Sequence, residues 1–241
     1  MTSHRSRTSD ARAAKPLEFV HIDLAGPVDP SSKDGFRYAL ICMDDFSGLS
    51  NLYFLKNKSD AATAFKKFLA DTSPYGRVKR VISDQGGEFV SSEFSSLLVE
   101  NKIKHEKSAP FSPHQNGTAE RAWRTLFDMA RCLLLQSGLP KTIWPYAVMA
   151  ASYIRNRCIN KRLGIIPFEA VTNKKPNMKN MQQFEKPGYA FVQNPKQLND
   201  RSEKGCFVRF DRDSPAHLVY FPDSEAVKKV RIVKFLEDDI L

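Results

Sequence analysis

The sequence contains few of the features that mark a secreted, zinc-binding or membrane protein. It has four cysteines, which lie far apart and form no C-x-x-C pair, so a zinc site or a disulfide framework is not indicated and a reducing compartment is favoured. No apolar run reaches the ~18 residues expected of a membrane span, and we therefore expect no membrane partner. The N-terminal segment is basic and polar and lacks the apolar stretch of a signal peptide, which predicts disorder over residues 1–15.

Acidic residues are the minority among the charged residues. The 241 residues include 37 Lys and Arg against 27 Asp and Glu, which gives a net charge of +10 and an isoelectric point near 9.4. This surplus is typical of proteins that bind a polyanion, although it can equally serve only to keep a protein soluble. With 41% hydrophobic and 11% aromatic residues, the chain has enough apolar material for one catalytic domain and a small second one.

Three acidic residues stand out against this basic background. Asp23 lies in HIDLAGP, Asp84 in SDQGGEF and Glu120 in HQNGTAER, with 35 residues between the last two. Converging carboxylates without a thiol or imidazole partner suit Mg²⁺ or Mn²⁺, and two such ions about 3.5–4 Å apart can clamp the attacking and leaving oxygens of a phosphodiester displacement. The pattern therefore indicates phosphoryl transfer on DNA, although a single Asp of this kind is more often a turn or cap residue. Without cations the carboxylates repel one another, so we expect a loose site.

The order of the predicted elements indicates an α/β fold followed by a β-rich segment. Strands are predicted over residues 17–24, 36–46, 49–55, 78–83 and 103–109, and helices over 60–71, 92–101, 118–137 and 142–157. The two prolines and the glycine of residues 110–117 predict an irregular loop, which places Glu120 in the first turn of the next helix. Such an order predicts a mixed sheet flanked by helices. Later β-like runs at 189–194, 205–210, 216–221 and 227–235 predict a small barrel or sandwich.

Seven sequence blocks follow one another in an order that is typical of one protein family. They are HIDLAGP, MDDFSG, YFLKNKS, SDQGGEF, SPHQNGTAERAWRTLFDMAR, YIRNR and IPFEAVTNKKP. Together with the spacing of Asp23, Asp84 and Glu120, they resemble the D,D-35-E integrases of copia-type LTR retrotransposons. The resemblance implies an RNase H-like catalytic core over residues 16–175 and a small β-rich domain over residues 176–241.

The resemblance also implies an activity. An integrase of this family trims the 3′ ends of the element's cDNA and joins them to target DNA, in two metal-dependent reactions. Asp23, Asp84 and Glu120 would be the catalytic residues and would hold two Mg²⁺ or Mn²⁺ ions. The implied partners are double-stranded DNA and further copies of the chain, and the implied location is the nucleus, after a cytoplasmic particle stage.

Several polar residues near the acidic triad have two interpretations. Asn116, Arg121 and Arg124 are candidates for DNA contacts, but Asn-Gly is a common turn and the two arginines can form a solvated helix face. Asp44 and Asp45 lie beside a predicted hairpin turn and are expected to be structural. His21 shares a strand face with Asp23 and is expected to be partly buried, whereas His105 has no partner that is visible in the sequence.

The chain also departs from the family pattern. Only His4 precedes the core and no cysteine precedes Cys42, so we expect the family's N-terminal zinc-binding module to be missing. Two other hypotheses therefore stay open: an RNase H-like nuclease that cuts without joining, and a transposon-derived, non-catalytic DNA-binding protein. A joined product made from a 3′-hydroxyl donor would distinguish the transferase from the nuclease.

Overall fold

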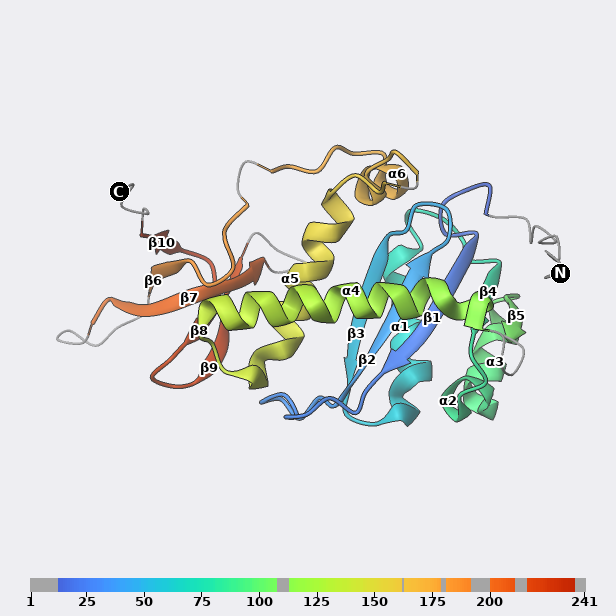
Figure 1. Ribbon diagram of the computed structural model, residues 1–241, viewed down its shortest axis with the longest axis horizontal. Helices are drawn as coiled ribbons and strands as arrows, with labels where there is room; N and C mark the ends of the chain where they lie inside the picture. The colour runs from blue at the N-terminus through green and yellow to red at the C-terminus, as the bar shows by residue number, and fades with distance from the viewer. Residues whose placement is uncertain are drawn as a thin grey trace, which may run out of the picture. The chain divides into compact units, whose positions relative to one another are not determined.

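The computed structural model describes residues 13–107, 113–161, 163–178, 181–191, 200–210 and 216–236, without the side chains of residues 113–116. Most of the segment predicted to be disordered, residues 1–12, lies outside the described residues. The described chain forms two five-stranded sheets, which belong to two units (Figure 1). The first unit contains residues 1–124 and 154–176, and the second contains residues 125–153 and 177–241. No described helix is long and apolar enough to cross a membrane.

The first unit is built on a mixed sheet with the strand order β3-β2-β1-β4-β5. Its strands are β1 (Phe19–Ala25), β2 (Tyr38–Asp44), β3 (Ser50–Leu55), β4 (Arg80–Ser83) and β5 (Lys104–Lys107). The antiparallel pairing of β2 with β3 confirms the predicted hairpin, and β4 runs parallel to both β1 and β5. The central strand β1 is covered on both faces, which explains its nearly continuous apolar sequence.

One face of this sheet is covered by three helices. They are α1 (Ala61–Thr72), preceded by the 3₁₀ turn η1 (Lys58–Asp60), and the consecutive helices α2 (Gly87–Val90) and α3 (Ser92–Glu100). Four phenylalanines from these helices are fully buried, and neighbouring ring centroids lie 5.3–5.6 Å apart: Phe65, Phe68, Phe89 and Phe94. They pack with Val20, Ile22 and Leu24 of β1. Because strand side chains alternate, Asp23 faces the opposite side of the sheet, which α4 crosses in Figure 1.

Helix α4 (Pro113–Ser137) begins five residues earlier than predicted. The prediction of an irregular loop was wrong for residues 113–117, and residues 108–112 lie outside the described residues. Proline fits the first position of a helix, because its missing N–H would have no helical partner there. Glu120 therefore lies about two turns into the helix rather than in its first turn. Trp123, on the same helix, is buried.

The remaining helices follow α4 in the chain. A 3₁₀ turn, η2 (Lys141–Ile143), leads into α5 (Trp144–Arg157), and α6 (Pro167–Thr172) follows. The final residues of α5 belong to the first unit, where the Asn156 side chain bonds both backbone groups of Ser50 at 3.0 Å and 2.8 Å. Helices α2 and α6 were not predicted, because each is shorter than two turns and shows too little periodicity.

The second unit is built on an antiparallel sheet with the order β10-β6-β7-β8-β9. Its strands are β6 (Pro187–Phe191), β7 (Ser202–Phe210), β8 (His217–Phe221), β9 (Ala226–Val230) and β10 (Val233–Phe235). The prediction of a single strand over 227–235 was wrong, because this segment forms two strands. The first, β9, pairs with β8, and the second, β10, pairs with β6 at the other edge of the sheet. The predicted small β-rich segment is nevertheless present. The domain boundary at residue 176 stays a prediction.

Candidate active site

Asp23 and Asp84 come from neighbouring parallel strands. The register of β1 and β4 pairs Val20 with Val81 and His21 with Ile82. Two residues further along, the same register brings Asp23 level with Asp84, which directly follows β4. Adjacent strands are about 4.8 Å apart, and residues two apart in a strand point to the same face. Both carboxylates therefore lie on the face of the sheet opposite the phenylalanine core.

The Asp23 carboxyl group is half-buried and has acidic neighbours. Burial, followed by the negative charges of Asp84, Glu120 and Glu88, raises its pKa to about 7, and the backbone N–H of Leu24, which donates to Oδ1 at 3.0 Å, acts in the opposite direction. Burial is the largest cause, and the charge contributions show that the other carboxylates lie within electrostatic range of Asp23. The fold thus brings together the three acidic residues that the sequence predicts for the site.

Glu88 is a fourth acidic residue at this place, and sequence reasoning missed it. The N–H of Gly86 donates to Asp84 Oδ1 at 3.0 Å. A Cβ added to Gly86 would lie 3.0 Å from the same Oδ1 and 2.9 Å from Glu88 Cδ, so both carboxylates lie close to the same glycine. The signal in the sequence is Gly86 between Asp84 and Glu88, because a residue without a Cβ leaves room for the two carboxylates beside it.

These four carboxylates suit a hard divalent cation by ligand type, since Mg²⁺ and Mn²⁺ prefer oxygen. Among the described residues, however, no three acidic, histidine or cysteine side chains are gathered closely enough to hold an ion in their present positions. Asp84 and Glu120 are exposed, so their side chains are free of the packing that would prevent them from moving. The donor set therefore fits such an ion in chemistry, and binding would draw the side chains together.

The acidic residues of the hairpin have structural partners. Asp44 accepts hydrogen bonds from the backbone N–H groups of Leu17 and Ser47, at 2.8 Å and 2.9 Å. Asp45 Oδ1 lies 3.1 Å from Nε2 of His21, and both side chains are buried. These contacts join the start of β1 to the β2–β3 turn, so the structure supports the structural interpretation of Asp44 and Asp45.

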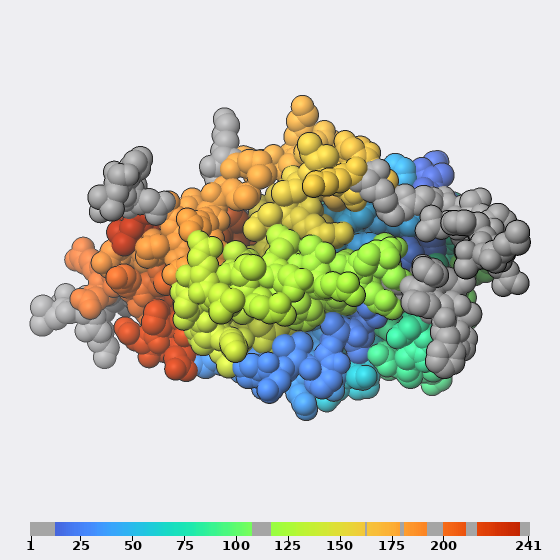
Figure 2. Space-filling view, in the orientation of Figure 1, coloured from blue at the N-terminus to red at the C-terminus, as the bar shows by residue number. Residues whose placement is uncertain are grey.

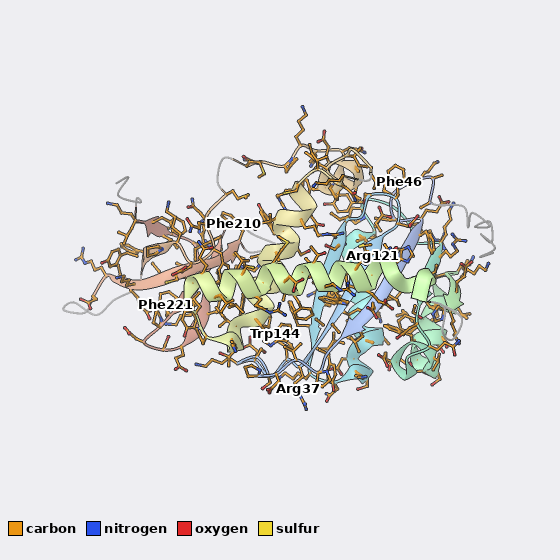
Figure 3. The ribbon with its side chains drawn as sticks, in the orientation of Figure 1. Arg37, Phe46, Arg121, Trp144, Phe210 and Phe221 are labelled. Atoms are coloured by element: carbon orange, nitrogen blue, oxygen red, sulfur yellow. The ribbon has the colours of Figure 1, made fainter. Side chains whose placement is uncertain are left out.

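The predicted DNA contacts lie on α4. Arg121 and Arg124 are exposed, and the outer face of the helix is open to solvent (Figure 2). Arg121, labelled in Figure 3, extends back along the helix, since its Nη1 lies 3.0 Å from the position of a Cβ on Gly117. The backbone of Asn116 belongs to α4, but its side chain lies outside the described residues. Contacts of these three residues with DNA stay predictions.

Comparison with known proteins identifies the family. Residues 13–113 match the model of the integrase core domain, and residues 187–241 match that of the retroviral polymerase SH3-like domain. The chain is 32% identical to the retrovirus-related Pol polyprotein from transposon TNT 1-94 of Nicotiana tabacum, over 97% of this chain and 18% of the polyprotein. The corresponding polyprotein from transposon RE2 of Arabidopsis thaliana is 32% identical over 95% of this chain and 16% of the polyprotein. The chain belongs to the copia-type retrotransposon integrases. It spans less than a fifth of either polyprotein.

Solved structures of retroviral integrases share the fold of this integrase. An intasome of simian T-cell lymphotropic virus matches with a TM-score of 0.58 and 18% identity, over 95% of this chain and 82% of that one. The HTLV-2 integrase catalytic core domain, solved with magnesium in a trimeric form, matches with a TM-score of 0.51 and 20% identity, over 66% of this chain and 99% of that one. These likenesses confirm the predicted fold class, a mixed sheet flanked by helices as in integrase cores.

Proposed function

We propose that this integrase catalyses metal-dependent phosphoryl transfer on double-stranded DNA, with Asp23, Asp84 and Glu120 as its catalytic residues. The observation that supports this most directly is the register of β1 and β4, which brings Asp23 level with Asp84. Burial, together with the charges of Asp84 and of Glu120 on α4, raises the pKa of Asp23 to about 7, as expected of an acidic cluster. A site that accumulates negative charge in a chain with a net charge of +10 is suited to cations that bridge the protein and phosphate.

Two divalent cations fit this donor set. Asp23 and Asp84 would hold one, and Asp23 and Glu120 would hold the other. When bound, Mg²⁺ or Mn²⁺ would favour deprotonation of the attacking oxygen and neutralise charge on the leaving oxygen. The role of the protein is to carry the carboxylates on β1, at the end of β4 and on α4, so that their side chains need only move a short way to close around the ions.

The proposed reaction has two steps with the same chemistry. In the first, water attacks a phosphodiester near the 3′ end of the cDNA, so that the terminal nucleotides leave and a 3′-hydroxyl remains. In the second, this 3′-oxygen forms a bond to a phosphorus of the target DNA, and the 3′-oxygen of the target leaves. Neither step needs a covalent intermediate between protein and DNA.

Contacts with the DNA backbone would come from α4. Arg121 and Arg124 are exposed on the helix that carries Glu120, and guanidinium groups bind phosphate oxygens well. Asn116, in the first turn of the same helix, would contact the DNA end. These contacts would fix the register of the DNA relative to the carboxylates without reading its sequence.

Assembly and location are part of the same proposal. Two of the solved integrases are described as an intasome and as a trimeric core, and we extend self-association and binding of paired DNA ends to this chain. Its substrate would be the element's cDNA and the target DNA, which places the reaction in the nucleus after passage through a cytoplasmic particle.

A strand-transfer assay tests the proposed function. A labelled duplex with a recessed 3′ end is incubated with supercoiled plasmid and either Mn²⁺ or EDTA, using the wild type, Glu120→Gln and Glu100→Gln. Glu100 is an exposed glutamate at the end of α3 and serves as the matched control. We expect Mn²⁺-dependent joined product from the wild type and the control, and a loss of at least about a hundredfold with Glu120→Gln, because one ligand of the reacting site is removed.

Other outcomes would favour the alternative functions. Nicked plasmid without joined product would favour the nuclease. DNA binding without any product in either metal would favour the non-catalytic DNA-binding protein. Salt dependence of binding would not distinguish them, because all three proteins contact phosphate.

A further inference from the structure

His105 lies on the opposite face of the sheet from the carboxylates. In the parallel pairing of β5 with β4, His105 is the register partner of Val81, so the two side chains share a face of the sheet. Val81 belongs to the phenylalanine core. The ring centroid of His105 lies 5.9 Å from that of Phe94, a fully buried residue of the same core. The imidazole therefore cannot reach a cation held by Asp23 and Asp84, and any influence on that site must pass through the strand.

A hydrogen-bonded chain connects His105 to the backbone of Asp84. The hydroxyl of Ser83, the last residue of β4, donates to the backbone oxygen of Asp84 at 2.7 Å. The same hydroxyl oxygen lies 2.8 Å from Nε2 of His105. A hydroxyl has a single hydrogen and a carbonyl oxygen can only accept, so the proton of the second bond must belong to Nε2. His105 is thus the donor, Ser83 the relay, and the Asp84 carbonyl the final acceptor.

Two contacts restrain Asp84. The hydrogen-bonded chain through Ser83 fixes its backbone carbonyl, and the turn at Gly86 fixes its carboxylate. Asp84 is exposed and follows the end of its strand, where the backbone has no further β4 ladder bonds to restrain it. Ser83 is fully buried at 0% exposure, so water cannot replace the imidazole as donor to its hydroxyl.

We propose that His105 is a positioning residue that, through Ser83, sets the orientation of Asp84 for cation binding. The inference rests on the proposed role of Asp84 as a metal-holding residue. Partners that orient metal ligands from behind typically contribute about tenfold to a hundredfold to metal affinity. His105 is not a catalytic residue in this scheme, since it touches neither the cation nor the DNA.

The test measures Mn²⁺ affinity by isothermal titration calorimetry and stability in EDTA by thermal unfolding. His105→Leu removes the donor, whereas His105→Gln retains an N–H donor near the position of Nε2. We expect His105→Leu to weaken Mn²⁺ binding about tenfold or more and His105→Gln to restore most of the affinity. Ser83→Ala breaks the same chain, so its effect and that of His105→Leu should be strongly non-additive in the double variant.

A matched control separates positioning from general stability. Thr72→Val removes another buried hydroxyl, which donates to Phe68 O at 2.7 Å within α1. It should lower the unfolding temperature and leave Mn²⁺ affinity unchanged. If His105→Leu does not fold, Ser83→Ala carries the test, because it removes only one oxygen.

Two results would overturn the positioning role and leave the metal role of Asp84 standing. One is wild-type protein that binds Mn²⁺ while His105→Leu and Ser83→Ala bind it equally well, which would leave the proposed function intact. The other is an ¹⁵N NMR spectrum of the wild type that places the proton of neutral His105 on Nδ1, which would remove the donor from the chain. Wild-type protein that binds no Mn²⁺ would refute the metal role of Asp84, and the positioning role would be refuted with it.

Discussion

Gly86 and Glu88 lie so close together that a methyl group on Gly86 would come within 2.9 Å of Glu88 Cδ. The other nearest atoms are Asp84 Oδ1 and Glu88 Oε2, each at 3.0 Å, so the end of a flexible side chain would have to move. The backbone of Gly86 has φ −54°, which alanine adopts without strain. Gly86→Ala should therefore displace carboxylates and leave the fold in place.

We predict that Gly86→Ala weakens Mn²⁺ binding about tenfold while its unfolding temperature in EDTA stays close to that of the wild type. The control is Gly87→Ala, because a Cβ at Gly87 would meet no atom within 4 Å. Calorimetric titration with Mn²⁺ measures both variants. Equal affinities for the two would show that the positions of Asp84 and Glu88 do not matter for the cation.

The pKa of Asp23 makes the stability of the cation-free protein depend on pH. This pKa is about 7 in the folded protein against an ordinary value of 3.8, so the folded state binds more protons between these values. The contribution of protonated Asp23 is fully present below about pH 4 and is lost as the pH rises through about 7. Burial also raises the pKa of Asp44, which contributes in the same direction.

We therefore predict that the free energy of unfolding in EDTA falls between pH 4 and pH 7, and that Asp23→Asn reduces this slope. Urea unfolding at several pH values measures it, with Asp34→Asn, at an exposed position, as control. In Mn²⁺ the stabilisation by the cation should grow over the same range, because the cation and the proton compete for Asp23. A slope unchanged by Asp23→Asn would contradict the prediction.

A substitution at Phe68 tests the phenylalanine core on the face of the sheet opposite the carboxylates. Phe68 is fully buried and packs against the rings of Phe65 and Tyr53, with centroids 5.6 Å and 6.5 Å away. Phe68→Ala should lower the free energy of unfolding by about 3–5 kcal/mol, the usual cost of such a cavity. Val99→Ala, at a position with 76% exposure, should change it by less than about 0.5 kcal/mol. Chemical denaturation compares the two.

Arg121 offers a test of the DNA-binding face of α4. If its guanidinium neutralises one phosphate, Arg121→Gln should weaken binding to all DNA sequences alike and reduce the slope of log K against log salt concentration by about 0.9. The control is Arg131→Gln, further along α4, whose guanidinium pairs with Asp128 at 2.9 Å. Fluorescence anisotropy at several salt concentrations measures the slope. Identical slopes for the two variants would place the phosphate contact elsewhere.

Much of the first sheet could be predicted because its signals are local. The apolar run that carries Asp23, the Ser47-Gly48 turn and the short strand before Asp84 each indicate their structure within a few residues. The start of α4 could not be predicted in this way, since the loop propensities of Asn116 and Gly117 are a weak prior that the rest of the helix overrides. Likewise, β9 and β10 have similar sequences, and their separation depends on which distant strand each one pairs with.

The acidic residues of the site could be found from their types and spacing, but their surroundings could not. Glu88 matters because the chain turns at Gly86, and His105 matters because β5 lies beside β4. Both relationships exist only across the folded chain. The sequence shows His105 as an isolated imidazole, whereas the structure shows it bonded to the residue that precedes Asp84.

Helices α4 and α5 each contribute residues to both units, since the boundaries fall after Arg124 and after Tyr153. The chain thus enters the second unit, returns to the first and leaves it again. A protein fragment that stops at residue 176 would retain residues 125–153 without the sheet of their own unit, and a fragment that starts there would lack those residues. Either half would therefore lack part of the packing that these helices have in the whole chain, and each half is expected to be less stable alone than as part of the whole chain.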